Sequence, residues 1–249
     1  IKENTKIKLT NDILKPNYNV KNKKDIIIYH THTCESYTPT KANKYKASGN
    51  FRTTDLDHSV VRIGKELEEE LKKLKFNVIR NTTKHDYPAY TGSYTRSLKT
   101  VEGILSKDKD AEIVFDIHRD AVGNKSNYAP TVEINGEKVA QLMFVIGTND
   151  GGGKHPNWKK NLKFAVKVQE KANKMYPGLF RSINLRSATF NQKGISKKIY
   201  LMMQRIFIYP DNKKELVGNE KLMQDVYILL THKEKNMRGN VIENLNYIL

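Results

Sequence analysis

The chain has 249 residues, with 44 Lys and Arg against 27 Asp and Glu, which gives a formal net charge of +17. This length suits one substantial domain, which buries enough apolar surface to fold without a disulfide or a structural metal. Cys34 is the only cysteine, which excludes an intramolecular disulfide. No apolar run is long enough to cross a bilayer, and no signal peptide is recognisable.

The positive charge favours polyanionic partners, such as nucleic acid, anionic lipid or the acidic polymers of a cell wall. The basic residues are spread along the chain, and neither a zinc-finger spacing nor an RNP-like aromatic run accompanies them. We therefore do not expect the chain to bind nucleic acid.

The first part of the chain changes from polar to strongly apolar. Residues 1–24 are polar with scattered apolar positions, and we expect a linker there. Residues 25–29 form a short β-branched run that predicts a buried strand. Residues 37–58 are polar and contain Pro39 and Gly49, which predicts a long loop. Long loops in compact domains are often functional.

Strands and helices are then expected to alternate. The apolar spacing after Ser59 predicts a helix that Ser59 or Asp57 caps. Further strands are expected at 76–80, 112–118 and 141–147, and further helices at 97–105 and 158–176. This alternation predicts an α/β fold with a largely parallel central sheet flanked by helices. We assign residues 25–204 to the catalytic domain and residues 205–249 to its C-terminal part or to a divergent tail.

Histidines follow two of the predicted strands, at the sheet edge where ligands bind in such folds. His32 and Glu35 form a His-x-x-Glu unit after the first strand, and His118 ends the third. This is the ligand order of carboxypeptidase-like zinc hydrolases, and three such ligands leave one zinc position open for water. Asp55 is an alternative oxygen ligand. The competing interpretation is that these are ordinary polar residues at strand ends.

Two neighbouring groups bear on this site. Asp116 and Asp120 flank His118, and strand alternation places Asp116 on the same face, which favours it as the partner that orients the imidazole. Cys34 lies inside the first cluster and is a thiolate or nucleophile candidate. We favour the interpretation that Cys34 is a small, half-buried packing residue, and we rank a cysteine hydrolase below a zinc hydrolase.

Several blocks of the chain resemble the SpoIIP family of sporulation proteins. The blocks lie between residues 25 and 192 and include His30–Tyr37, Arg52–Asp55, Val60–Gly64, His85–Pro88, Gly92–Ser97, Asp116–Ala121, Phe144–Gly147 and Asn191–Gln192. The resemblance implies a zinc amidase that cuts peptidoglycan between N-acetylmuramic acid and L-alanine, with peptide cross-links as a second cleavage site. It also implies action with SpoIID-like and SpoIIM-like proteins during forespore engulfment. The location it implies is extracytoplasmic, at the sporulation septum, through a membrane anchor outside this chain.

The resemblance also assigns roles to residues. His32 and His118 match the family's essential histidines, and Glu35 is the matching carboxylate. Candidates for holding the substrate or stabilising the oxyanion are His30, His85, Tyr94, Arg96 and Arg119.

One expected feature departs from the family pattern. A late strand that carries a general acid/base Glu is expected after Gln192, but residues 199–206 offer Gln204 instead. Glutamine cannot transfer a proton as a carboxylate does. Glu133 and Glu215 are weak substitutes. The alternative function is therefore a catalytically weakened homologue that serves as a zinc-containing, peptidoglycan-binding interaction module.

Overall fold

A computed structural model describes residues 1–4, 7–16, 25–37, 39, 44–46, 50–120, 130–152, 155–188 and 199–205. Within them, strands and helices alternate along most of the chain, as the sequence predicts. The predicted elements are confirmed as β2 (Ile26–Tyr29), α2 (Val60–Lys73), β3 (Val78–Arg80), α3 (Ser93–Lys107), β4 (Ile113–Arg119), β7 (Leu142–Gly147) and α4 (Trp158–Met175). A short 3-10 turn, η1 (Leu56–His58), precedes α2, and the Ser59 hydroxyl caps α2 by accepting from the Val61 amide.

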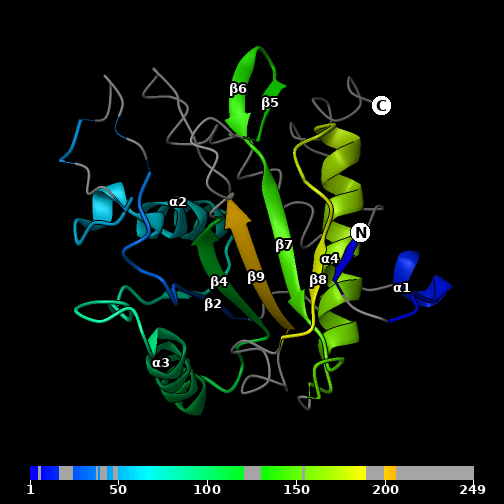
Figure 1. Ribbon diagram of the computed structural model, residues 1–249, viewed down its shortest axis with the longest axis horizontal. Coiled ribbons are helices and arrows are strands. Elements are labelled where there is room, and N and C mark those ends of the chain that lie inside the picture. The colour runs from blue at the N-terminus through cyan, green and yellow to red at the C-terminus, as the bar shows by residue number, and fades with distance from the viewer. Residues whose placement is uncertain are drawn as a thin grey trace.

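Seven of the described strands form one large sheet in the order β1-β8-β7-β9-β4-β2-β3, where β1 is Lys2–Asn4, β8 is Asn184–Arg186 and β9 is Ile199–Arg205. Neighbouring strands are parallel except at one position, where β7 runs antiparallel to β9. The fold is therefore α/β with a largely parallel sheet. Because β7 is reversed, its beginning lies at the same edge as the ends of β4 and β9 (Figure 1).

Helices cover both faces of the sheet, and the alternation of side chains along β2 and β4 supplies both cores. Ile26, Ile28 and Phe115 pack on one face with apolar residues of α2 and α4. Ile27 and Val114 face the other side, where α3 packs through Val101, Leu98 and Ile104. This three-layer arrangement holds the ends of β2 and β4 between α2 and α3.

A two-stranded hairpin, β5 (Thr131–Ile134) and β6 (Glu137–Ala140), projects beyond the beginning of β7 (Figure 1). Asn135 and Gly136 form its turn with φ values of 53° and 78°. Positive φ at both central residues is what a two-residue type I′ turn requires, and Asn-Gly is its strongest sequence signal. That signal identifies the hairpin, which the strand and helix pattern did not predict.

The described part of residues 1–24, where a linker is expected, packs against the domain. β1 pairs with β8, and α1 (Asn11–Leu14) buries Ile13, which is 1% exposed, in the core shared with α4. Lys163 of α4 forms an ion pair with Asp12. None of the described helices is long and apolar enough to cross a membrane.

Candidate active site

A buried polar cluster lies where the parallel strands β2 and β4 end. His32 comes from the turn that follows β2, and His118 is the penultimate residue of β4, 86 positions later in the sequence. Their ring centroids are 5.3 Å apart, and the rings are nearly perpendicular. Both side chains are almost fully buried, at 6% and 1% exposure. The sheet therefore brings together two histidines that the sequence places far apart.

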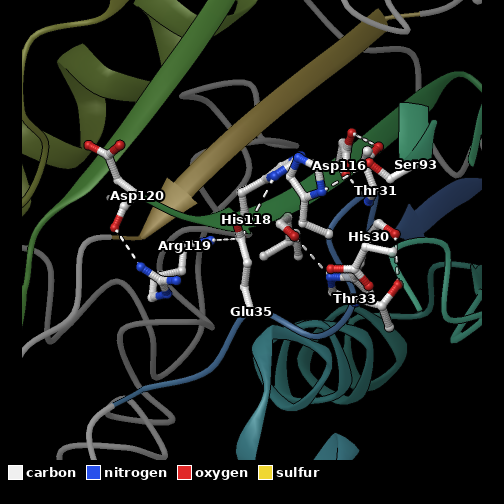
Figure 2. A network of polar contacts seen from close by, with 12 residues as sticks. His30, Thr31, Thr33, Glu35, Ser93, Asp116, His118, Arg119 and Asp120 are labelled. Atoms are coloured by element: carbon white, nitrogen blue, oxygen red, sulfur yellow. Dashed lines mark hydrogen bonds and ion pairs between the residues drawn. The ribbon is translucent and has the colours of Figure 1, made fainter. Parts of the chain in front are cut away.

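His118 lies between two carboxylates (Figure 2). Its Nε2 is 2.9 Å from Asp116 Oδ1, and its Nδ1 is 3.8 Å from Glu35 Oε2. Burial alone would lower the pKa of the imidazole, but Asp116 and then Glu35 outweigh burial and raise the pKa of His118 to about 9. The alternation argument for Asp116 is therefore confirmed, whereas Asp120 forms an ion pair with Arg181.

The Asp116 carboxylate is fully buried and held by Thr31. The Thr31 amide donates to Oδ1 at 2.8 Å, and its hydroxyl donates to Oδ2 at 2.7 Å. The same hydroxyl lies 2.9 Å from the Ser97 hydroxyl of α3. This network fixes the carboxylate beside the ring of His118, whose Nε2 lies 2.9 Å away without hydrogen-bond geometry, so Asp116 acts on the ring mainly through its charge. Sequence reasoning missed Thr31, whose only signal is its place between His30 and His32.

The hydrogen-bond partners of His32 are neutral groups, unlike those of His118. Ser93 Oγ lies 3.3 Å from its Nδ1, and the Tyr90 hydroxyl lies 3.2 Å from its Nε2. The Tyr90 ring also stacks on the imidazole at 4.6 Å, and Tyr94 meets it edge-on at 5.3 Å. Burial, followed by the repulsion of His118, lowers the pKa of His32 to about 4. His32 is therefore a neutral imidazole at physiological pH.

Glu35 completes the cluster from the turn after β2. Its Oε2 accepts a hydrogen bond from the Arg119 amide at 2.6 Å, so the carboxylate is tied to the end of β4 (Figure 2). Burial raises the pKa of Glu35, although His118 and Arg119 oppose that effect. The Glu35 carboxylate therefore lies beside His118, and the Arg119 amide binds it to the end of β4.

His30 lies on the opposite side of β2 from His32, against α2. Its Nδ1 donates to the Ile117 carbonyl at 3.0 Å, while its buried Nε2 has no hydrogen-bond partner among the described residues. A Cβ placed on Gly64 of α2 would lie only 2.6 Å from that nitrogen. Burial lowers the pKa of His30 to about 4. This packing indicates that His30 joins β2 to β4 and to α2.

The turn that carries His32 and Glu35 is held from outside by Asp86 and Arg52. Asp86 accepts from the Cys34 amide at 3.0 Å, and Arg52 Nη2 donates to the Asp86 carboxylate at 2.8 Å. Glu35 and Arg52 also form an antiparallel backbone bridge. Sequence reasoning gave neither Arg52 nor Asp86 a role, although both lie in the blocks that carry the family resemblance.

Cys34 itself is buried in this turn. Burial and the Asp86 carboxylate raise the pKa of the thiol to about 12, so the group is a protonated thiol at neutral pH. A cysteine nucleophile needs a lowered pKa or an adjacent base. The environment of Cys34 therefore disfavours the cysteine hydrolase alternative.

The remaining predicted site residues lie around the cluster in different ways. Tyr94 contacts His32 directly. His85 is buried and bonds the His30 carbonyl at 2.7 Å and Thr100 at 3.0 Å. Arg96 donates to the backbone carbonyls of His85, Ala89 and Thr91. The Arg119 guanidinium donates to the carbonyls of Asp120 and Phe51. His85 and Arg96 therefore stabilise the 85–91 loop that carries Tyr90.

The alternative carboxylates among the described residues, Asp55 and Glu133, are not part of the cluster. Asp55 bonds His58 and the Asp57 amide, and its side chain is 53% exposed. Glu133 lies exposed on the β5–β6 hairpin, at the same edge of the sheet. Gln204 pairs in register with His118, so β9 brings this position beside the cluster. Glu215 lies outside the described residues.

The chemistry of the cluster fits zinc, although the three predicted ligands do not form a closed set. Among the described residues, no three His, Cys, Asp or Glu groups are arranged to hold a metal ion. His118 Nδ1 and Glu35 Oε2 are 3.8 Å apart, wider than the roughly 3.4 Å between two ligands at about 2.1 Å from a tetrahedral zinc, so a small closure would bring them into place. His32 Nε2 contacts the Tyr90 hydroxyl instead. Asp116 beside Nε2 leaves Nδ1 of His118 as the ligand nitrogen.

Comparison with known proteins gives matches along most of the chain. The family model described as Stage II sporulation protein P (SpoIIP) matches residues 1–202. Stage II sporulation protein P of Bacillus subtilis (strain 168) is 30% identical over 176 residues, which cover 66% of this chain and 40% of the relative. The chain thus spans less than half the length of this curated relative.

The comparison with solved structures also gives amidases, with TM-scores below 0.5. An N-acetylmuramoyl-L-alanine amidase from Clostridium difficile 630 matches with a TM-score of 0.48 and 17% identity, over 92% of this chain and 98% of that one. The CwlD amidase from Clostridioides difficile, solved in complex with the GerS lipoprotein, has a TM-score of 0.47 and 17% identity, over 83% of this chain and 94% of that one.

Proposed function

We propose, from the premise that this chain belongs to the stage II sporulation protein P (SpoIIP) family, that it is a zinc-dependent peptidoglycan hydrolase. Its reaction is hydrolysis of the amide between N-acetylmuramic acid and L-alanine, and peptide cross-links are a possible second substrate. The observation that carries this proposal is the convergence of His32, Glu35 and His118 in one buried cluster at a sheet edge.

The residues that would hold the metal are His32, Glu35 and His118. His32 is a neutral imidazole because of its burial, which is the protonation state that a ligand needs, whereas His118, with a pKa of about 9, would release a proton as the metal binds. Asp116 and Thr31 orient His118, and the Arg119 amide orients Glu35. A metal bound at His32 Nε2 would replace that nitrogen's bond to the Tyr90 hydroxyl. A bound zinc polarises a scissile carbonyl and lowers the pKa of its water from about 16 to about 7.

The surrounding groups supply the remaining steps. Burial of the cluster excludes bulk water and strengthens each polar contact at the reacting carbonyl. Tyr90 and Tyr94 both touch His32, and burial raises the pKa of each phenol, so both stay protonated and able to donate a hydrogen bond to a developing oxyanion. Tyr90 is the more exposed of the two and faces outward from the cluster.

A second candidate function follows from the register of β9. Gln204 occupies the position beside His118, where the family pattern leads us to expect a proton-transferring Glu. Loss of a general acid/base costs about 10²- to 10⁴-fold in rate. A weakened homologue that binds zinc and peptidoglycan as an interaction module is therefore the alternative.

Partners and location are part of the same proposal. The family assignment supports peptidoglycan as the substrate, SpoIID-like and SpoIIM-like engulfment proteins as partners, and an extracytoplasmic position at the engulfing membrane. The net charge of +17 suits a cell wall rich in anionic polymers.

The test combines metal content with cleavage of dye-labelled peptidoglycan. We expect about one zinc per chain, dye release that a chelator abolishes and zinc restores, and loss of both zinc and release in His118→Ala. His58→Ala is the matched control, because His58 is a half-buried histidine outside the cluster that bonds Asp55. Zinc without cleavage would favour the interaction module, and a zinc-free protein that still cuts would refute the metal site.

A further inference from the structure

A pocket of about 440 Å³ opens beside the candidate active site, between residues 52–54 and the 86–90 loop. Its wall includes Arg52, Thr53, Thr54, Tyr87, Pro88 and Tyr90. The volume lies in the range of small-molecule sites, roughly 300–1,000 Å³. The function proposed above uses only Tyr90 from this set, so the pocket is otherwise without a role.

Tyr90 is the boundary between the pocket and the cluster. One side of its ring stacks on His32 at 4.6 Å, and the Arg52 guanidinium lies over the ring at 5.0 Å. The pocket therefore begins one aromatic ring away from His32. One substrate molecule can therefore place a group in the pocket and its scissile bond at the cluster.

The pocket wall is fixed by a buried ion pair. Arg52 Nη2 donates to the Asp86 carboxylate at 2.8 Å and to the Asp86 carbonyl at 3.0 Å. The Asp86 side chain is fully buried, and that of Arg52 is 22% exposed. The positive charge of Arg52 is thus matched by a buried negative charge. The pocket is preorganised and carries little net charge, which disfavours a ligand recognised by its carboxylate or amine.

The accessible surface of the pocket is aromatic and hydroxylic. Tyr87 is 57% exposed and is among the most exposed large apolar side chains described. Thr53 and Thr54 line the facing segment, and the Thr53 hydroxyl accepts from the Asp55 amide at 3.1 Å. An aromatic face attracts the slightly positive C–H groups of a pyranose ring, and nearby hydroxyls exchange hydrogen bonds with its substituents. This combination suits a neutral sugar.

We propose that this pocket is a saccharide subsite, which holds a sugar ring of the glycan strand beside the cluster with Tyr87 as its stacking face. The proposal rests on the function above for its substrate, because the amide to be cut joins a sugar to a peptide. In this arrangement, the sugar side of that amide lies over the pocket wall formed by Arg52 and Tyr87. The stem peptide then extends away from this pocket.

Binding is tested with N-acetylglucosamine tetramer, a sugar probe that has no peptide amide and needs no catalysis. Calorimetric titration of the folded chain should give measurable affinity, which Tyr87→Ala weakens on the order of tenfold because the stacking face is lost. Tyr87→Phe keeps the ring and should retain affinity within about twofold. Phe51→Leu is the matched control, since Phe51 is 46% exposed but does not line the pocket.

Two further outcomes separate this inference from the hydrolase proposal. Binding of the free stem peptide that Tyr87→Ala abolishes, with no sugar binding, would overturn the saccharide assignment while leaving hydrolysis intact. Dye release with an unchanged KM in Tyr87→Ala would overturn the subsite in the same way. Conversely, Tyr87-dependent sugar binding in a chain that does not cut peptidoglycan would support the subsite and refute only the hydrolase.

Discussion

The two histidines of the candidate site end neighbouring parallel strands, yet their surroundings are opposite. His118 lies between Asp116 and Glu35, which raise its pKa to about 9 even though burial opposes them. His32 lies among Tyr90, Tyr94 and Ser93, where burial lowers its pKa to about 4. Two buried histidines on neighbouring strands therefore prefer opposite protonation states.

This difference shows that nearby carboxylates can outweigh burial at His118, whereas burial decides the state of His32, whose hydrogen-bond partners are neutral. Around His118 the sheet places a carboxylate two residues earlier on the same strand, and Thr31 holds that carboxylate in position. Around His32 the partners come from α3 and from the loop before it, and all are neutral. The His118 side is thus rigid and charged, and the His32 side is aromatic and uncharged.

The largest expected effect is on the charged side. Asp116→Asn keeps the shape of the carboxylate but removes its charge, so it should lower zinc affinity and peptidoglycan cleavage about 10- to 100-fold. Zinc titration and dye release measure both quantities. Asp110→Asn, on an exposed residue that precedes β4, is the control and should leave them unchanged. Equal losses in the two variants would mean that orientation of His118 by Asp116 does not matter.

The same variant gives a pH prediction for the metal-free chain. A folded-state pKa of about 9, above the ordinary 6.5, contributes stability that is fully present below pH 6.5 and is lost as pH rises through 9. Unfolding free energy measured at steps over this window should therefore fall in the metal-free wild type and vary less in Asp116→Asn. NMR titration should show the pKa of His118 moving down in the variant. An unchanged pKa would contradict the role given to Asp116.

Packing of α2 against His30, at the end of β2, is tested at Gly64. Because an added Cβ would lie 2.6 Å from His30 Nε2, Gly64→Ala should lower the unfolding free energy by about 1–3 kcal/mol. Gly103→Ala in α3 is the matched control. Nothing lies within 4 Å of its added Cβ, so alanine should stabilise the helix by up to about 1 kcal/mol. Denaturant unfolding of both variants checks the sign, and a stable Gly64→Ala would show that His30 is free to move.

A smaller effect is expected on the neutral side. Ser93→Ala removes a hydroxyl 3.3 Å from His32 Nδ1. A single neutral hydrogen bond contributes about 0.5–1.5 kcal/mol, so zinc affinity should fall by roughly two- to tenfold. Comparison with Asp116→Asn by the same zinc titration sharpens the contrast between the two sides. If Ser93→Ala costs more than Asp116→Asn, the neutral side controls the site instead.

The smallest effect is expected at Cys34. With a pKa of about 12, only about one thiol in 10⁴ is ionised at pH 8, so iodoacetamide should label the folded chain far more slowly than the denatured one. Mass spectrometry of timed samples measures this. Cys34→Ala should retain cleavage, and its loss would revive the cysteine hydrolase alternative.

The sequence by itself predicted most of the described elements and selected the candidate site residues. Apolar periodicity identifies β2, α2, β4, β7 and α4, because burial on one or two faces imposes that period on the chain. Strand-end position selects His32 and His118, and alternation selects Asp116, because parallel strands end at one edge and alternate residues share a face. Asn135-Gly136 contains the signal for the β5–β6 hairpin, which apolar spacing alone did not identify.

Only the tertiary structure decided which strands pair and which side chains contact the site residues. The reversal of β7 and the pairing of β1 with β8 depend on contacts between segments far apart in sequence. So do the stacking of Tyr90 on His32 and the Arg52–Asp86 pair, which join loops from different parts of the chain. Local pattern carries no information about such contacts, because loop conformation is set by side chains that meet only after the sheet has formed.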